Sequence, residues 1–259
     1  MRRIFKLPEP LGLRKYKATA SLKHSYEDGS DCFVDYKKCT ETESEFCYES
    51  ANENENEKKD SAFDELRKQL LKEQKYVCCY CGQAIKKIQN NQGSPLMKTE
   101  HFAPKKGENA QAHLQLEYSN LFAVCLGNQN SAGEKHCDSK KGDLPLVYIK
   151  NPATSSFLTV FEYRVLPNQK KVTVHAKKGI AYQSEIEQEI NKVLNLNEQS
   201  LAQRRFSYWK REIEDALRGK WTKPRLEALI AEFEGSNVTH HKDFSDFILQ
   251  YLSQKIKTI

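Results

Sequence analysis

Apolar residues recur at helical spacing just before the densest group of cysteines in the chain. Phe63, Leu66 and Leu70 are three and four positions apart, so they lie on one face of a helix. Ser61 is a suitable N-cap residue for this helix, and the periodicity ends near Tyr76. The pattern predicts a helix that leads directly into the cysteines.

Other segments favour strands. Residues 96–102 and 121–124 indicate two short strands, separated by a segment with several turn-forming residues. Residues 157–163 and 171–175 are rich in β-branched and aromatic side chains, with a turn signal at Pro167 between them. The sequence therefore predicts one small two-stranded unit and a separate β-hairpin.

The C-terminal third has helical periodicity in successive segments. Apolar stripes cover residues 186–194, 206–217 and 244–252. Such stripes are more typical of core or partner-docking faces than of cofactor sites. Arg204 and Arg205 lie off the second stripe, where a solvated face is a simpler interpretation than a nucleic-acid contact.

These elements divide the chain into three regions with an expected α+β fold. Residues 1–60 form an N-terminal arm without clear periodicity and an acidic linker with an Asn-Glu repeat at 52–57, a candidate partner-binding segment. Residues 61–146 hold the cysteines and the first strands, and end in a short helix that starts near Cys137. Residues 147–259 hold the hairpin and a mainly helical C-terminal region.

Charge and cysteine content narrow the class of protein. The chain has 41 Lys and Arg against 35 Asp and Glu, a net charge of +6 that is consistent with a polyanionic partner without requiring one. It has no apolar leader and no apolar run of membrane-spanning length, so we expect a cytoplasmic protein that does not enter the membrane. In that reducing setting, its cysteines should be metal ligands or free thiols rather than disulfides. Cys32, Cys39 and Cys47 are spaced too loosely for a metal knuckle, and free thiols are their simpler interpretation.

Four cysteines have the pattern of a structural zinc site: Cys78, Cys81, Cys125 and Cys137. Two residues separate the first pair, so a single turn can supply two of the four soft ligands that Zn²⁺ binds in a tetrahedron. The second pair is more widely spaced, which leaves Cys79 and His136 open as substitutes.

Between the cysteine pairs stand residues suited to phosphodiester hydrolysis. Such a site needs a base that takes a proton from water and a cation that stabilises the charge developing on the phosphate. His101 can be neutral near pH 7 and can therefore act as the base. Glu100 and Asp138 offer hard oxygen ligands for Mg²⁺ or Mn²⁺. Asn120 stands at the start of the second predicted strand.

These motifs resemble those of the HNH, or ββα-metal, endonucleases. The shared features include Cys-x-x-Cys, Glu-His-x-x-Pro at 100–104, Asn-Leu, and Cys-Asp-x-x-Lys-Gly-Asp at 137–143. Within that family the chain is similar to the PtuB-like proteins of retrons and the Septu system, which it also resembles at Leu-Asn-Leu-Asn (194–197) and Arg204-Arg205. The resemblance is most specific over residues 66–143 and implies a zinc-stapled ββα-metal core.

The resemblance implies a role for each polar residue. His101 corresponds to the general base, and Glu100 and Asp138 correspond to ligands of the catalytic Mg²⁺ or Mn²⁺. Asn120 corresponds to an asparagine that orients the loop holding the base. Lys141 could approach the substrate phosphate, although a solvated helix lysine is an ordinary alternative. Many family members have Asp before the histidine and Asn or His in place of Asp138, so the metal preference stays open.

The same resemblance implies partners. PtuB-like proteins act in bacterial anti-phage defence beside a PtuA-like ATPase of the ABC/SMC kind, in some cases with a retron reverse transcriptase and its DNA. The resulting hypothesis is a metal-dependent endonuclease that cuts DNA or RNA. The alternative is a zinc-stapled adaptor that binds nucleic acid or protein and keeps an inactive HNH remnant. The four polar residues together favour the nuclease, because an adaptor does not need all of them.

Overall fold

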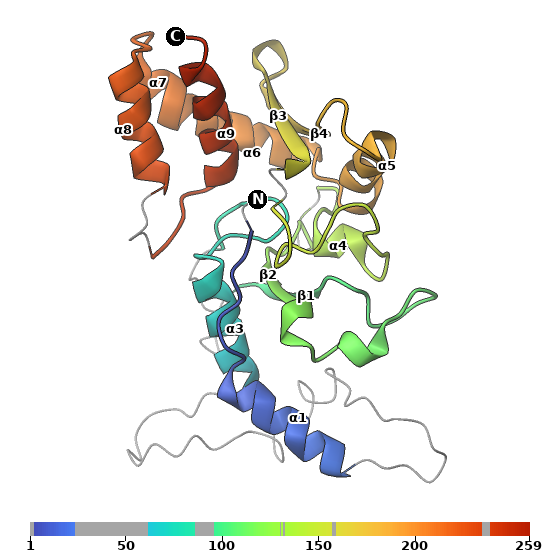
Figure 1. Cartoon of the computed structure of the whole chain (residues 1–259). Helices are drawn as coiled ribbons and strands as arrows, with labels where there is room; N and C mark the ends of the chain where they lie inside the picture. Colours follow the sequence, from blue (N-terminus) through green and yellow to red (C-terminus); the bar gives the residue numbers. More distant parts are fainter. Residues whose placement is uncertain are drawn as a thin grey trace.

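The computed structural model of the chain describes residues 3–23, 62–85, 96–129, 131, 133–156, 159–234 and 239–259. The predicted acidic repeat and Cys32, Cys39 and Cys47 lie outside these residues. The described part is a mixed α/β structure with two separate, two-stranded antiparallel sheets (Figure 1). Its N-terminal helix lies at the bottom of Figure 1, the first sheet lies near the centre, and the C-terminal helices lie at the top.

The N-terminal region contains a helix that the hydrophobic pattern did not predict. α1 (Leu11–Lys23) packs against α3 (Ala62–Glu73), the helix predicted before the cysteines. Leu13 is buried, and the Glu65 carboxylate accepts the backbone N–H of Gly12 at 2.8 Å. One buried leucine and one carboxylate contact give no periodic signal. Residues 11–23 of the N-terminal arm therefore form a helix against α3, although their sequence has no clear periodicity.

The extended residues that precede α1 are attached to the body of the protein. The Lys6 ammonium lies 2.6 Å from the Glu73 carboxylate, and 4.3 Å and 4.4 Å from the ring centroids of Tyr118 and Phe122. Burial lowers the pKa of Lys6, and the neighbouring Glu73 opposes that shift. Phe5, in contrast, is 74% exposed.

The first sheet consists of β1 (Lys98–His101) and β2 (Leu121–Val124), close to the two strands predicted there. The strands pair antiparallel, with Glu100 opposite Phe122. All four residues of β2 are buried, and β2 contacts α3. α4 (Asp138–Lys141) is the predicted short helix. The order of the elements in this region is therefore strand, strand, helix.

The predicted hairpin is present. It consists of β3 (Phe161–Leu166) and β4 (Lys171–Ala176), joined by a 3₁₀ turn at Pro167–Gln169. Lys170 closes the turn with a left-handed φ of 50°. β3 begins at Phe161, later than the sequence pattern predicted, while residues 157–158 lie outside the described part.

The C-terminal region is helical, as predicted, and comprises α5 (Gln183–Gln188), α6 (Gln199–Trp209), α7 (Asp215–Leu217), α8 (Lys223–Glu234) and α9 (Ser245–Ile256). π-helical turns at Glu189–Val193 and Lys210–Glu214 follow α5 and α6. α9 packs against α8 and β3, and its residues Ile248 and Leu252 are fully buried. The stripe at 244–252 is thus part of the core rather than a free docking face. No helix in the described residues is both long and apolar enough to cross a membrane.

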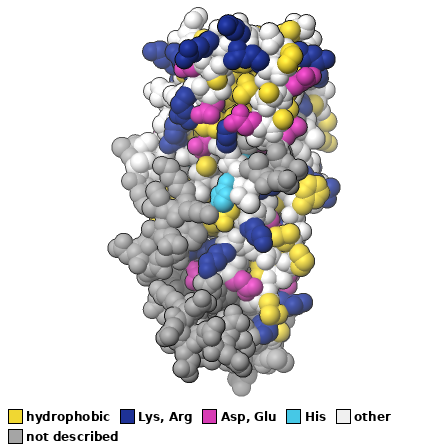
Figure 2. All heavy atoms as spheres, turned by 90° about the vertical axis from the view of Figure 1, so that its left-hand side faces the viewer, with side chains coloured by type: hydrophobic (Ala, Val, Ile, Leu, Met, Phe, Trp, Pro, Cys, Tyr) yellow, Lys and Arg dark blue, Asp and Glu magenta, His cyan; other side chains and the backbone are white. Residues whose placement is uncertain are grey.

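The face of the molecule that carries α8 is shown in Figure 2. Lys and Arg side chains are interspersed with Asp and Glu over its upper, helical part, and hydrophobic side chains lie between them. The described residues on this face do not gather the positive charge excess into one basic stripe.

Candidate metal centre and nuclease site

The four predicted zinc ligands come from three separate places in the fold. Cys78 and Cys81 lie in a tight turn after α3, in which the Gly82 N–H donates to the Cys78 carbonyl at 3.1 Å. Gly82 has a φ of +72°, a conformation that glycine adopts without strain. Cys125 directly follows β2, and Cys137 directly precedes α4. The sheet and the short helix therefore bring the second pair to the first.

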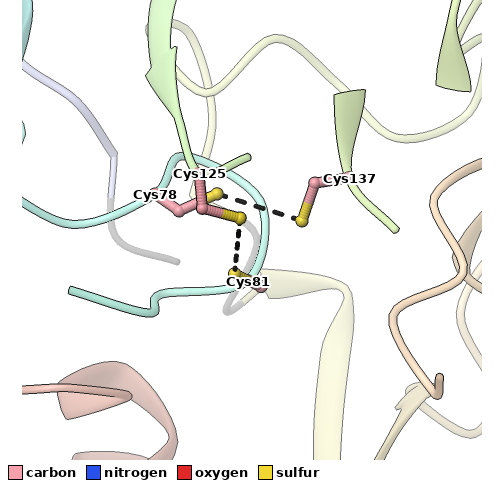
Figure 3. Close-up of side chains that lie close together, drawn as sticks. All are labelled: Cys78, Cys81, Cys125 and Cys137. Carbon is pink, nitrogen blue, oxygen red and sulfur yellow. Dashed lines mark hydrogen bonds between the residues drawn. The ribbon is translucent and has the colours of Figure 1, made fainter. Parts of the chain in front are cut away.

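The four sulfur atoms point toward one another and lie within 4.8 Å of each other (Figure 3). The Cys78 and Cys137 sulfurs are 3.9 Å apart, and those of Cys81 and Cys125 are 3.8 Å apart. A tetrahedron with Zn–S bonds of about 2.3 Å has S–S edges of about 3.8 Å. Burial opposes ionisation of Cys78, but hydrogen bonds from Cys125 and Cys137 hold the pKa of its thiol well below the ordinary value. The cluster could therefore hold zinc.

Cys79 and His136, the two substitutes that the sequence left open, are outside this cluster. Burial and the neighbouring Cys78 charge raise the pKa of the Cys79 thiol well above its ordinary value. The His136 Nδ1 lies 3.1 Å from the sulfur of Cys137, so this side chain contacts a predicted ligand.

A second group of predicted residues lines one pocket of about 260 Å³. Glu100 and His101 reach it from β1, and Asp138 reaches it from the first residue of α4. Lys98 and Lys105 also line it. The structure thus brings together the expected base and the two expected metal-binding carboxylates.

Glu100 is buried at the inner side of this pocket. Its Oε1 accepts a hydrogen bond from the Tyr80 hydroxyl at 2.6 Å and lies 2.9 Å from the Lys141 Nζ. Burial raises the pKa of Glu100 to about 8; Lys141 opposes this shift and the Asp138 carboxylate adds to it. Two neighbouring carboxylates repel each other when both are ionised, and a cation between them removes that repulsion. This donor set fits Mg²⁺ or Mn²⁺.

Asp138 forms an ion pair with Lys98, whose Nζ lies 2.6 Å from Oδ2. Burial raises the pKa of Asp138, but hydrogen bonds with Glu100 and Lys98 outweigh burial and lower it overall. Asp138 is therefore the ionised member of the carboxyl pair. Lys98 precedes Glu100 by two positions on one strand, so the period of two could have placed it on the same face. No comparable signal identifies Tyr80.

His101 is 8% exposed, and its Nε2 lies 2.9 Å from the carbonyl oxygen of Gln115. A carbonyl only accepts hydrogen bonds, so Nε2 carries the hydrogen and Nδ1 of the neutral ring carries the lone pair. Burial, together with Lys105, lowers the pKa of His101 to about 4. The imidazole is therefore neutral at pH 7 and can accept a proton at Nδ1.

Asn120 holds the loop that follows His101. Its Oδ1 accepts the backbone N–H of Ala103 at 2.7 Å. Its Nδ2 donates to the carbonyls of Ala103 and Leu114 at 3.2 Å and 3.1 Å. These contacts connect Asn120 to the loop that follows His101, and the resemblance implies an orienting asparagine at this position.

Lys141 is 1% exposed and points inward. Its Nζ donates to the backbone carbonyl of His101 at 3.0 Å and pairs with Glu100. This position differs from both sequence interpretations, a phosphate contact and a solvated helix residue. In the structure Lys141 lies beside the Glu100 carboxyl group and fixes the backbone of His101.

Comparison with known proteins gives one further observation. No family model matches the chain. A curated Escherichia coli protein, named as the inferred HNH endonuclease of retron Ec83, is 31% identical over 86 residues. The match covers 30% of this chain and 32% of the relative, so the chain spans about a third of the length of that relative. The similarity supports the HNH nuclease family and does not distinguish its PtuB-like branch.

Proposed function

We propose that the chain is a metal-dependent HNH endonuclease that hydrolyses phosphodiester bonds of nucleic acid. The observation that carries this proposal is the pocket in which the neutral imidazole of His101 lies beside the carboxyl groups of Glu100 and Asp138. The similarity to a protein named as a retron HNH endonuclease supports the same class. We assign the nuclease core to residues 61–146, between the N-terminal region and the C-terminal region.

His101 is the proposed general base. Its Nδ1 takes a proton from water while the water oxygen attacks phosphorus, and the leaving oxygen departs with the electron pair of the broken P–O bond. The hydrogen bond from Nε2 to the Gln115 carbonyl orients the ring and stabilises the imidazolium that forms. Asn120 holds the backbone that follows the base in place.

Glu100 and Asp138 would hold the catalytic Mg²⁺ or Mn²⁺. When bound, that ion stabilises the negative charge that develops on the phosphate and the leaving oxygen. Lys141 balances Glu100 from the buried side, with a side chain that is 1% exposed. The Lys98 side chain is 32% exposed, so it can withdraw from Asp138 toward solvent when a cation binds.

The four-cysteine cluster is proposed to hold one structural zinc ion. Cys78, Cys81, Cys125 and Cys137 leave no ligand position open in a tetrahedron, which is the arrangement of structural rather than catalytic zinc. This ion would connect the turn after α3, the end of β2 and the start of α4.

The biological setting is proposed from the resemblance and from the relative's name. We place the nuclease in the bacterial cytoplasm, in a retron or Septu type of anti-phage system, with a PtuA-like ABC/SMC ATPase and, in the retron case, a reverse transcriptase and its DNA. The N-terminal segment is the proposed contact with the ATPase, because Phe5 and Leu7 are 74% and 40% exposed there. Undiminished co-purification of the ATPase with a chain that lacks residues 1–10 would exclude this contact.

Cleavage of labelled DNA and RNA by the full chain, alone and with the ATPase, tests the proposed activity. We expect cleavage that requires a divalent ion and falls about 10²–10⁴-fold in His101→Ala. His113→Ala is the matched control, because His113 is an exposed histidine in a 3₁₀ turn at Ala112–Leu114. All three proteins should keep the same zinc content.

Two outcomes would contradict the proposed nuclease. Cleavage by His101→Ala at the parent rate would remove the histidine from the mechanism. Binding of nucleic acid by the parent and its partner, without cleavage of either DNA or RNA, would favour the adaptor instead.

A further inference from the structure

Arg205, in α6, is the largest fully buried side chain in the described part of the protein. Its Nη1 donates to the Leu196 carbonyl at 2.6 Å, while Nε and Nη2 have no hydrogen-bond partner among the described residues. Burying a cation is costly unless a negative charge compensates it. The guanidinium lies 5.8 Å from the ring centroid of Phe244, which favours the cation, and a nearby negative charge would favour it further.

The cysteine cluster can supply this charge. Burial lowers the pKa of Arg205 overall, and Tyr163, followed by Cys81 and Cys137 in their ionised forms, opposes that shift. Cys137 and Arg205 also bond to neighbouring residues of one segment. The Leu194 carbonyl accepts the Cys137 backbone N–H at 2.8 Å, and the Leu196 carbonyl accepts the Arg205 Nη1–H at 2.6 Å. Four thiolates around one divalent ion leave two net negative charges in the protein interior.

Arg204 reaches the same cluster through a histidine. Its Nη2 lies 3.3 Å from the His136 Nε2, and the His136 Nδ1 lies 3.1 Å from the sulfur of Cys137. A guanidinium only donates, so Nε2 accepts and Nδ1 of the neutral ring carries the hydrogen. His136 therefore donates to the Cys137 sulfur, and a thiolate accepts such a bond better than a thiol does.

We propose that Arg204, Arg205 and His136 form a counter-charge shell that holds the four cysteines as thiolates on one divalent ion. The two guanidiniums match the two net negative charges, and the histidine N–H orients a lone pair of Cys137. Partners that bond to a metal ligand in this way tune the affinity of the site. The shell rests on the zinc assignment made in the proposed function.

The shell also explains the pair of arginines that the sequence pattern placed off the apolar stripe. Arg205 is 0% exposed, so neither a solvated face nor a nucleic-acid contact describes it. Both arginines come from α6, in the C-terminal region, whereas the cysteines belong to the proposed nuclease core. Attraction between these arginines and the negatively charged metal centre thus stabilises the contact between the helical region and the core.

Zinc affinity of the full-length protein, measured by competition with a chromogenic chelator at fixed pH, tests the shell. Arg204→Met, Arg205→Met and His136→Ala should each weaken zinc binding about 10–100-fold. Lys210→Met is the matched control, because it removes one exposed positive charge directly after α6 and should leave the affinity unchanged. His136→Asn keeps an amide N–H near the Nδ1 position and should recover part of the loss.

Double variants distinguish the effect of Arg204 on the cysteine cluster from the effect of Arg205. Arg204 acts through His136, so Arg204→Met should add little in the His136→Ala background. Arg205→Met should retain its full effect there. Should Arg205→Met not fold, Arg205→Lys keeps the charge and should bind zinc within a few fold of the parent.

Cobalt substitution gives a readout that general destabilisation would not imitate. Loss of the N–H donor makes the Cys137 sulfur richer in electrons, so His136→Ala should shift the thiolate-to-cobalt charge-transfer band to longer wavelength. Lys210→Met should keep the parent spectrum. Parent-like affinities and spectra in all variants would overturn the shell, as would a folded parent that binds neither zinc nor cobalt. A parent that does not cleave nucleic acid, but binds zinc and shows the expected losses of affinity in the variants, would count against the proposed nuclease and leave the shell standing.

Discussion

Replacing Glu100 with Gln should make the protein more stable at high pH and inactive as a nuclease. Burial raises the pKa of Glu100 from 4.5 to about 8 in the folded protein. The unfolded chain therefore gives up this proton at lower pH than the folded protein does. The contribution of Glu100 to stability is fully present below pH 4.5 and is lost as pH rises through about 8.

The size of the effect follows from the same shift. Each pKa unit corresponds to about 1.36 kcal/mol, so a shift from 4.5 to about 8 sets an upper limit of about 5 kcal/mol. Gln has the same shape, can accept the bonds from Tyr80 and Lys141, and can donate its amide to Asp138. Gln has no carboxyl proton to lose, so the pH-dependent contribution of Glu100 to the free energy of unfolding should disappear.

Urea unfolding between pH 5 and 9, without added magnesium, measures how much Glu100 contributes to the pH dependence of stability. The free energy of unfolding of the parent should fall over that range more steeply than that of Glu100→Gln. Glu227→Gln, in an exposed position on α8, should keep the parent slope. Added Mg²⁺ should flatten the slope of the parent, because a cation permits both carboxyls to ionise. Equal slopes for the parent and Glu100→Gln would refute this account of the pocket.

Three further changes test other parts of the site. Cys81→Ser should lose zinc and much of its solubility, because the binding energy of four-cysteine sites, on the order of 10 kcal/mol, contributes to folding. Elemental analysis measures the zinc content, and a folded parent protein without zinc would contradict this prediction. Asp138→Ala should keep zinc but bind Mn²⁺ more weakly by calorimetry, and excess Mn²⁺ should restore part of its cleavage, whereas His101→Ala should gain nothing from added metal. Asn120→Ala should slow cleavage and destabilise the protein by about 1–3 kcal/mol in denaturant unfolding, because it leaves the Ala103 N–H without its side-chain partner. Parent-like values would show that the loop after His101 keeps its conformation without Asn120.

The elements that the sequence predicted are those with a local signal. β2 was placed at its observed bounds because four consecutive apolar residues are buried there. The hairpin followed from β-branched composition on either side of Pro167. The grouping of the four cysteines followed from metal-ligand chemistry, which restricts spacing and residue type more than packing does.

The features that the sequence did not predict depend on long-range contacts. α1 is stabilised by its contact with α3, which lies far along the chain, and its own residues have little amphipathic order. Lys141 and Arg205 look like surface residues in a helical pattern because both are charged. Their burial is determined by Glu100 in one case and, as we propose, by the cysteine cluster in the other. The pattern of hydrophobic and polar residues along the sequence does not identify a partner that is distant in the chain.

The proposed zinc cluster and the proposed catalytic pocket meet at adjacent residues, Cys137 and Asp138. Cys137 has a φ of 55°, which is uncommon for a residue other than glycine, and its N–H is held by Leu194 at 2.8 Å. α4 has only four residues, too few to sustain a helix by its own hydrogen bonds. Zinc bound to the sulfur of Cys137 would therefore fix where α4 begins, and so where Asp138 lies relative to Glu100. The structural ion would serve catalysis by holding this carboxylate in place, without contacting the substrate.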